Sequence, residues 1–304
     1  MDDVWPELAL AVPTFRRPTE LKATLEWACD QSLAPGRILV LDNDPEQSAK
    51  AVALRMADEV GDVRIDYRAL GWNAGPAGSY ATAISELQGG PQRWMLCSDD
   101  DNADGTRDRV RRYHAFLESV SSLRPTAIGI SGAIWDVRRS VARRHDDHEL
   151  VRGPVSCDVI PGPGLPMYDL SALRELGVGF RPELFFGFEE LALGLDIRAA
   201  GGLLLVDGPA ALERRRREGM SGLSGGTALE RRRSPWRTYF RHRNRILLAR
   251  EFGSRLGTAR LALRSGASAV LAVSRRDPAE AVAAFRGVVD GTLSPDRSVR
   301  RYIP

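Results

Sequence analysis

Three consecutive carboxylates, Asp99, Asp100 and Asp101, are the residues of this 304-residue chain whose types and spacing most directly suggest chemistry. They follow a short apolar run, Trp94 to Cys97, which predicts a buried strand. Like charges in a row repel one another, so a buried strand end would not carry them without a counter-charge. Carboxylates in this position can hold a hard divalent cation, which in turn binds phosphate oxygens. The alternative is a solvated turn that caps the next helix, where Asp is also common.

Polar side chains also follow the other apolar runs in the first part of the chain. Thr14 comes after the run from Leu8 to Val12, and Asp42 comes after the run from Ile38 to Leu41. Strand-like and helix-like segments alternate here, which predicts a mostly parallel sheet covered by helices. Ligands of open α/β sheets bind beyond the carboxyl ends of the strands. We therefore expect Thr14, Asp42 and Asp99 to converge at one edge of the sheet.

The elements that position these residues are predicted from apolar periodicity and from Gly and Pro punctuation. The expected strands are residues 8–12, 38–41, 63–67, 94–97, 127–135 and 203–206. The expected helices are residues 18–28, a helix after Pro45 that runs to about 60, one opened by the turn at residues 73–78 and reaching Leu87, one after Gly105 that runs to about 123, and residues 169–176, 189–199, 236–250, 256–273 and 278–289. Residues 140–152 are polar and predict a loop or hairpin, with His145 and His148 on the solvated surface.

The charge of the chain is unevenly distributed. Residues 214–304 contain 21 Lys and Arg against 7 Asp and Glu, a net charge of +14, whereas the preceding residues have a net charge of −11. Such a basic segment favours an anionic partner: a phosphate group, a phospholipid surface or nucleic acid. The alternative is that arginine is simply frequent in this chain. An apolar content of 43% and a charged content of 27% are ordinary for a globular protein.

The cysteines and the N-terminus indicate a cytoplasmic protein. Cys29, Cys97 and Cys157 are scattered, odd in number and without zinc-site spacing, which argues against a disulfide framework. The acidic start, Met1 to Asp3, has no apolar region of a signal peptide. No apolar run approaches the length of about 20 residues that a membrane-spanning helix needs. Peripheral contact with the inner face of the membrane would use the basic segment.

Six short motifs, taken in order, resemble the GT-A glycosyltransferases of family 2, which use nucleotide sugars. The motifs are Val12-Pro13-Thr14-Phe15-Arg16-Arg17-Pro18, Leu41-Asp42-Asn43, Asn73-x-Gly75-x-Ala77-Gly78, Asp99-Asp100-Asp101, Phe186-Gly187-Phe188-Glu189-Glu190 and Arg241-His242-Arg243-Asn244-Arg245. They cover about residues 8–250, and their common order is more specific than any one of them. The last motif and residues 275–278 look closest to bacterial galactofuranosyl- and rhamnosyl-type transferases.

The resemblance implies an α/β fold of GT-A (Rossmann-like) type, a mostly parallel sheet flanked by helices with a C-terminal helical extension. Residues 1–212 would form the nucleotide-sugar-binding and catalytic domain. Residues 213–304 would form a basic lid loop and a helical region packed on it. The lid is placed at Gly219 to Thr227, a Gly- and Ser-rich stretch between two arginine runs.

The resemblance also implies an inverting, metal-assisted transfer of a sugar from a UDP- or dTDP-linked donor to an acceptor hydroxyl. Asp99 and Asp101 would bring Mg or Mn to the donor pyrophosphate. Glu190 would be the general base, because a neighbouring carboxylate raises its pKa, and Glu189 would orient it or contact the acceptor. The donor would contact Pro13, Thr14, Arg17, Asp42, Asn73, Gly78, Asp99, Asp100 and Arg243, with Asp42 on the nucleobase. The acceptor would be a glycan, a lipid-linked glycan or a small molecule, and no nucleic acid is expected.

One departure from the family concerns the metal. Many members carry a metal-binding histidine beyond the last strand, where this chain has Glu213 to Arg217. Three alternatives stay open: the metal keeps additional water, His242 supplies the ligand, or arginine neutralises part of the diphosphate charge.

Two other functions compete with glycosyl transfer. A sugar-1-phosphate nucleotidyltransferase would need a Gly-rich loop with a basic residue after the first strand, and Val12 to Phe15 lacks those glycines. A non-enzymatic protein that binds anionic surfaces would use the basic segment, but it has no use for carboxylates gathered at one sheet edge.

Overall fold

The computed structural model describes residues 3–101, 106–218, 234–274, 276–293 and 302–304 of the chain. The described strands are β1 (Asp3–Thr14), β2 (Leu33–Asp42), β3 (Arg64–Ala69), β4 (Trp94–Cys97), β5 (Ala127–Gly129), β6 (Ala133–Asp136), β7 (Val141–Arg144), β8 (Pro154–Cys157), β9 (Met167–Asp169) and β10 (Leu204–Asp207). The α-helices are α1 (Pro18–Cys29), α2 (Lys50–Glu59), α3 (Gly75–Leu87), α4 (Arg109–Val120), α5 (Asp147–Leu150), α6 (Leu170–Leu176), α7 (Glu189–Ala199), α8 (Gly208–Arg217), α9 (Pro235–Phe252), α10 (Arg255–Ser274) and α11 (Pro278–Leu293).

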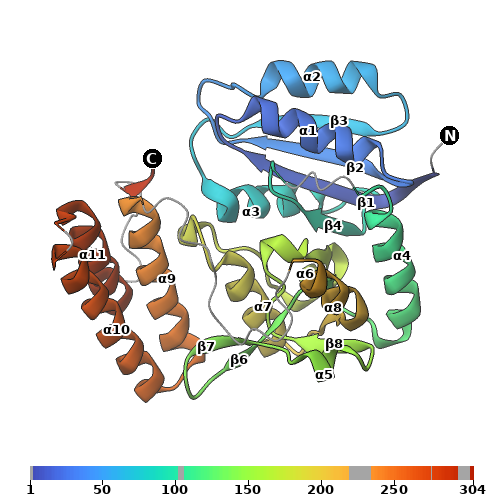
Figure 1. Ribbon diagram of the computed structural model, residues 1–304. Helices are drawn as coiled ribbons and strands as arrows, with labels where there is room; N and C mark the ends of the chain where they lie inside the picture. The colour runs from blue at the N-terminus through green and yellow to red at the C-terminus, as the bar shows by residue number, and fades with distance from the viewer. Residues whose placement is uncertain (1–2, 102–105, 219–233, 275, 294–301) are drawn as a thin grey trace.

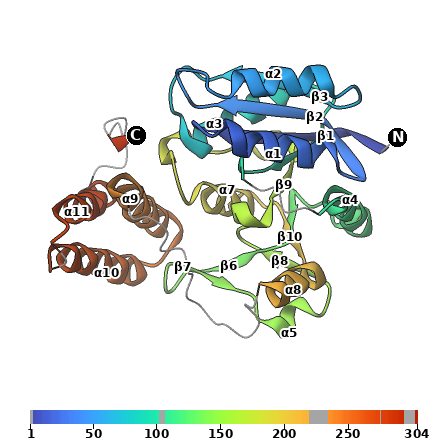
Figure 2. The ribbon, with the colours of Figure 1, turned by 45° about the horizontal axis from the view of Figure 1, so that its top comes forward.

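A central eight-stranded sheet carries helices on both faces, as Figure 1 shows. Its strand order is β3-β2-β1-β4-β9-β5-β10-β8, in which β9 and β8 run antiparallel to their neighbours. The other six strands run parallel, so their carboxyl ends share one edge. Helices α9, α10 and α11 pack on one another beside this sheet, a grouping that Figure 2 shows from a second direction. The expected mostly parallel sheet with a C-terminal helical extension is confirmed.

Alternation along β1 explains why the sheet is covered twice. Leu8 and Leu10 point into the core shared with α1, α2 and α4, whereas Ala9 and Ala11 point into the core shared with α3 and α7. Successive strand residues face opposite sides of a sheet, so a strand that is apolar throughout needs helices on both faces. This burial holds the strand ends, and the polar residues that follow them, in fixed positions.

The region from Ala127 to Trp135, expected as one strand, forms two. β5 ends at Gly129 and joins the main sheet, whereas β6 leaves it to pair with β7. Gly132 lies in the connection between the two strands and packs closely on β10, because a Cβ there would lie 2.6 Å from a Val206 methyl. Strands β8 and β9, which have four and three residues, are too short to give a periodic signal in the sequence.

The arginine run after Ala211 also differs from expectation. It belongs to helix α8, which continues through the expected domain boundary at residue 212 and ends at Arg217. Ala211 and Leu212 of α8 are buried in the core that α3 and α7 share. The first unit of the fold therefore extends beyond the expected boundary, because packing continues along the helix. The hypothesised lid, Gly219 to Thr227, lies outside the described residues.

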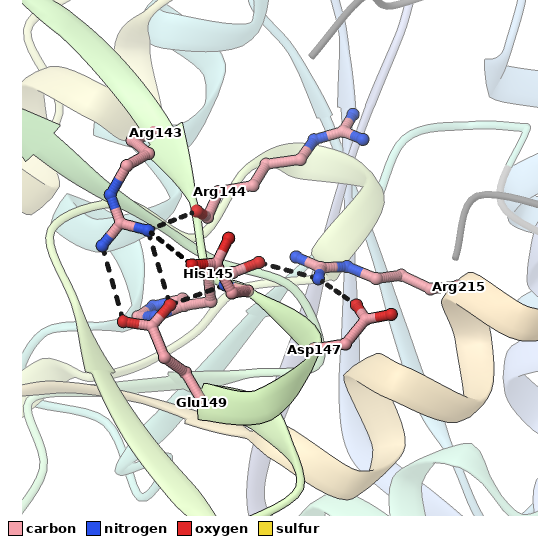
Figure 3. Close-up of polar contacts among 7 residues, drawn as sticks. Arg143, Arg144, His145, Asp147, Glu149 and Arg215 are labelled. Carbon is pink, nitrogen blue, oxygen red and sulfur yellow. Dashed lines mark hydrogen bonds and ion pairs between the residues drawn. The ribbon is translucent and has the colours of Figure 1, made fainter. Parts of the chain in front are cut away.

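The expectation that His145 is solvated is wrong, because only 4% of its surface is exposed. Figure 3 shows the cluster around it, in which Nδ1 of His145 lies 3.6 Å from Oε2 of Glu149. Arg215 of α8 donates to the His145 carbonyl oxygen (2.8 Å) and to Oδ1 of Asp147 (2.9 Å). These bonds tie α8 to α5. The exposed position expected for His148 is confirmed.

None of the helices that the structure describes has the length and apolar character needed to cross a membrane.

Candidate active site

The counter-charge of the acidic triplet after β4 is Arg17, the residue that precedes α1. Oγ1 of Thr14 donates to Oδ2 of Asp100 (2.9 Å), and Nη1 of Arg17 donates to Oδ1 of the same carboxylate (2.7 Å). Nη2 of Arg17 donates to Oδ2 of Asp101 (3.0 Å). Thr14 ends β1 and Arg17 precedes α1, so the ends of β1 and β4 do converge. In this structure both side chains hold the triplet, and their contact with a donor stays a prediction.

Asp99 faces a different partner, Glu190, which lies 91 residues further along the chain. A Cβ placed on Gly162 would lie 2.9 Å from Oε1 of Glu190 and 3.7 Å from Oδ2 of Asp99. The missing side chain of Gly162 thus leaves the space in which the two carboxylates meet. The expected grouping of Asp99 and Glu190 at one sheet edge is what the structure shows, and no sequence motif pointed to Gly162.

The surroundings of these carboxylates favour their neutral forms. Burial among protein atoms, together with like-charge repulsion from Asp99, raises the pKa of Glu190 to about 7. Burial and the charge of Asp101 raise the pKa of Asp99 to about 6. Asp99 is nevertheless exposed to solvent. Glu190 is therefore suited to take up a proton near neutral pH.

Glu189 has a different environment from its neighbour. It is 5% exposed, and its Oε2 accepts no hydrogen bond from any residue that the structure describes. Burial, followed by the charge of Glu190, raises the pKa of Glu189 well above its usual value. A carboxyl that stays protonated at neutral pH can donate a hydrogen bond. The two adjacent glutamates can thus serve as donor and acceptor.

Beneath the carboxylates lies a buried floor formed by Tyr80 of α3, Cys97 of β4 and Tyr168 of β9. Burial raises the pKa of all three well above their usual values, and the charge of Glu190 contributes in each case. The floor removes water from one side of the site, which strengthens electrostatic interactions there. Sequence reasoning missed Tyr168, because β9 has no recognisable pattern.

The segment before α7 is strained and is held from α9. Phe185, Gly187 and Phe188 have φ values of 58°, 77° and 73°. Left-handed conformations at non-glycine residues are unfavourable unless surrounding contacts impose them. Nδ2 of Asn244 supplies such contacts by donating to the carbonyl oxygens of Leu184 (2.8 Å) and Gly187 (2.9 Å). Asn244 therefore positions the start of α7, and with it Glu189 and Glu190.

The turn from Asn73 to Gly78 also contacts the segment before α7, at Phe185. Gly75 has a φ of 66°, and a Cβ on it would lie 2.3 Å from the carbonyl oxygen of Phe185. The Ala77 amide donates to that oxygen (3.3 Å), and the Gly75 amide donates to Oδ1 of Asn73 (3.1 Å). The glycine allows this close approach. Donor contacts by Asn73 and Gly78 stay predictions.

Asp42 ends β2 and is fully buried. Its carboxylate accepts hydrogen bonds from the amides of Asp44 (2.9 Å) and Ala49 (3.2 Å) and from the Tyr67 hydroxyl (2.8 Å). These bonds fix the loop after β2 and satisfy both oxygens in this structure, and the expected nucleobase contact stays a prediction. Pro13 lies beside β2 in the β1–β2 register and is also buried.

The structure corrects two expectations about α9. Arg243 is 1% exposed, and its Nη1 donates to the carbonyl oxygen of Glu183 (3.1 Å) and to Oδ1 of Asn244 (2.8 Å), so it is a buried anchor and not a donor contact. His242, considered as a metal ligand, packs instead against α11, where a Cβ on Gly287 would meet its Cβ at 3.0 Å. Burial and two flanking arginines lower the pKa of His242 to about 4.

The donor set fits a divalent cation by its chemistry. Carboxylate oxygens are the ligands that Mg and Mn prefer, and Asp99 and Asp101 lie close enough to repel each other. A cation between them would relieve this repulsion, in competition with Arg17. Among the described residues, which omit 102–105, no group of three or more His, Cys, Asp or Glu is arranged to hold a metal.

Comparisons with known proteins agree with this fold. Residues 9–117 match the sequence model of glycosyl transferase family 2, which confirms the expected resemblance over this range. A structure of GalNAc-T7 with UDP, GalNAc and Mn2+ is 15% identical, with a TM-score of 0.51 over 66% of this chain and 41% of that chain. This likeness shows a shared fold. No curated protein shows significant similarity to the chain.

Two further structures are similar at lower TM-scores. A mannosyltransferase from Pyrobaculum calidifontis, solved with GDP-Man and Mn2+, has a TM-score of 0.49 and 15% identity, over 97% of this chain and 90% of that chain. TarS from S. aureus has a TM-score of 0.47 and 12% identity, over 79% of this chain. The match spans 39% of the length of TarS.

Proposed function

We propose that the chain, whose residues 9–117 match glycosyl transferase family 2, is an inverting glycosyltransferase that acts at the carboxyl edge of β4. The observation that carries the proposal is the meeting of Asp99 and Glu190 around Gly162, at the sheet edge where α/β folds bind ligands. GalNAc-T7 was solved with UDP, GalNAc and Mn2+, which makes a UDP sugar with Mn the first combination to test. A dTDP sugar is the second.

The reaction needs a base on one side of the anomeric carbon and a leaving group on the other. Glu190 takes the proton of the acceptor hydroxyl, and the hydroxyl oxygen attacks the anomeric carbon. The bond between that carbon and the diphosphate oxygen breaks, so the configuration inverts. A pKa of about 7 lets Glu190 accept this proton near neutral pH. Glu189, whose pKa burial raises, would donate a hydrogen bond in its protonated form that orients the acceptor or its partner carboxylate.

The donor side of the site would use the acidic triplet and the residues around it. When bound at Asp99 and Asp101, Mg or Mn supplies Lewis-acid stabilisation of the departing diphosphate. Arg17 sets the charge of the triplet through its bonds to Asp100 and Asp101. The turn that contains Asn73 and Gly78 contacts the segment before Glu190 through Gly75 and Ala77, and it would let the backbone approach a bound donor.

Calorimetric titration with UDP and with dTDP, each with and without Mn, tests the donor assignment. We expect binding of one nucleotide that strengthens with Mn. No binding of either nucleotide under any of these conditions would refute the proposal. A screen of nucleotide sugars by mass spectrometry then identifies the sugar from the nucleoside diphosphate released.

The C-terminal helices α10 and α11 expose many large hydrophobic side chains. Among the residues that the structure describes, eight of the thirteen exposed large hydrophobic side chains belong to α10 and α11, including Leu263 at 75% and Phe285 at 62%. Helix α10 contains no acidic residue, and the acidic residues of α11, Glu280 and Asp290, are buried. Exposed apolar side chains on helices that also carry arginine favour binding to an anionic lipid surface. We propose that this face gives peripheral contact with the cytoplasmic side of the membrane, near a lipid-linked acceptor.

Sedimentation with vesicles that contain anionic lipid tests the membrane contact. We expect binding at low salt that weakens at high salt, because exposed charges are screened. Leu263→Glu should reduce binding, whereas Leu123→Glu, a matched change at an exposed leucine after α4, should leave it unchanged. Absence of binding at low salt would contradict the proposal, and dimer formation lost in Leu263→Glu would assign the face to a second copy of the chain.

A further inference from the structure

A cavity of 280 Å³ lies between α4 and α8, next to the acidic triplet but apart from Glu190. Its charged walls come from two helices: α4 contributes Arg109 and Arg112, and α8 contributes Arg214 and Arg217. Residues three apart lie on the same side of a helix, so each pair faces the cavity together. Asp101 lines the cavity at the end nearest β4. In the Glu213–Arg217 stretch, where family relatives often have histidine, Arg214 and Arg217 thus face a space beside the acidic triplet.

The carboxylates of this cavity are already engaged. Glu213 pairs with Arg112 (3.6 Å), and Glu218 pairs with Nε of Arg214 (2.8 Å). Oδ1 of Asp207 caps α8 by accepting a backbone amide of its first turn (3.1 Å). Arg217 is exposed and forms no ion pair with the residues that the structure describes. The positive charge of the α8 face is therefore only partly neutralised.

Arg109 occupies a position that a helix normally avoids for a cation. It is the first residue of α4, and the first turn of α4 contains no acidic side chain. The positive end of the helix dipole disfavours a cation here, and the nearest acidic residue in the sequence is the N-cap, Asp108. Burial lowers the pKa of Arg109, and the nearby Arg214, Arg217 and Arg112 lower it further. A bound anion would relieve the repulsion among these arginines, because guanidinium groups are suited to oxyanions.

The cavity shares a wall with the carboxylate site. Tyr113 of α4 donates from its hydroxyl to the carbonyl oxygens of Gly164 and Leu165, both at 2.7 Å. This segment begins at Gly162, which lies against Glu190 and Asp99. A ligand in the cavity would therefore lie one short turn away from the reacting groups.

We propose that this cavity is a phosphate site, in which Arg109 and Arg217 bind the oxygens of a mono- or diphosphate group. This inference rests on the proposed function. The phosphate would belong either to the leaving nucleoside diphosphate or to a phosphorylated acceptor. Guanidinium groups suit this role because their paired donors match two phosphate oxygens at once.

Calorimetric titration with inorganic pyrophosphate, without donor or acceptor, tests the site. We expect the full chain to bind pyrophosphate, and Arg109→Ala and Arg217→Ala each to weaken binding about tenfold or more, the usual effect of losing a charge-assisted hydrogen bond. Arg216→Ala is the matched control, because Arg216 is exposed on the same helix and does not line the cavity. Circular dichroism of each variant confirms that it is folded.

A second titration, with UDP added first, assigns the source of the phosphate. Pyrophosphate binding abolished by UDP would assign the cavity to the donor diphosphate, and unchanged binding would assign it to a phosphorylated acceptor. Failure of the chain to bind pyrophosphate, or equal weakening by Arg216→Ala and Arg217→Ala, would overturn the proposal. Because no sugar transfer is measured, this result stands independently of the glycosyltransferase assay.

Discussion

Replacing Glu190 by glutamine is expected to abolish catalysis and to stabilise the fold at the same time. The change keeps the shape of the side chain but removes its negative charge. Loss of a general base typically lowers a rate by a factor of about 10² to 10⁴. The gain in stability follows from the pKa of Glu190, which rises from 4.5 to about 7 in the folded protein.

The size and the pH range of this effect can be worked out from linkage. A raised folded-state pKa means that the folded protein binds the proton more tightly than the unfolded chain does. The resulting stability is fully present below pH 4.5 and is lost as the pH rises through about 7. Each pKa unit corresponds to about 1.36 kcal/mol, so ionised Glu190 destabilises the fold by about 3 kcal/mol as an upper bound. Water in the site reduces this, and we expect Glu190→Gln to be about 1–3 kcal/mol more stable than wild type at pH 8.

Urea unfolding followed by tryptophan fluorescence at pH 5 and pH 8 measures the difference. The stabilisation by Glu190→Gln should be large at pH 8 and much smaller at pH 5. Glu175→Gln, a change at an exposed glutamate of α6, is the control and should show no such dependence. The reasoning is refuted if the stability difference between Glu190→Gln and wild type is the same at both pH values. Transfer activity that equals wild type would independently refute the role of Glu190 as the base.

Three other changes test how the site is held together. Gly75→Ala should destabilise the fold by about 2–4 kcal/mol, because it combines a positive φ with a 2.3 Å approach to Phe185, whereas Gly179→Ala, with open space around it, should change the urea midpoint little. Asn244→Ala should lower kcat about tenfold or more and leave UDP affinity unchanged, because it releases the carbonyl groups before α7; an unchanged kcat would contradict a positioning role. Arg17→Gln should raise the pKa values of Asp99 and Asp100, both about 6, because the charge of Arg17 lowers them. Mn-dependent UDP binding, measured by calorimetry, should therefore weaken more at pH 6 than at pH 8. Equal weakening at the two pH values would count against this reasoning.

The positions of most helices and of the central strands could be predicted from the sequence, because their signals are local. The apolar run from Trp94 to Cys97 is bounded by charged residues, and its predicted limits coincide with β4. Helix α1 begins at Pro18 as expected, since proline suits the first turn of a helix. Strand β9 and the break after Gly129 could not be predicted, because they depend on pairing with distant strands.

The roles of individual polar residues were harder to predict than their positions. Arg243 and His145 are ionisable and would ordinarily lie on the surface, yet both are buried because other elements cover them. Asn244, one residue after Arg243, positions α7 by donating hydrogen bonds to carbonyl groups about 60 residues earlier in the chain. No window of sequence contains both members of such a pair.

The sequence by itself determined that carboxylates follow β4, that a pair of glutamates begins α7, and that both lie at the carboxyl edge of an α/β sheet. Periodicity, apolar runs and turn residues carry this information, since each acts over a few neighbouring positions. Only the tertiary structure decided that Gly162 leaves room for Asp99 to meet Glu190, that Arg17 neutralises Asp100 and Asp101, and that arginines of α4 and α8 face one cavity. The physical reason is that electrostatic and steric effects depend on distance in space, which chain folding sets and sequence separation does not.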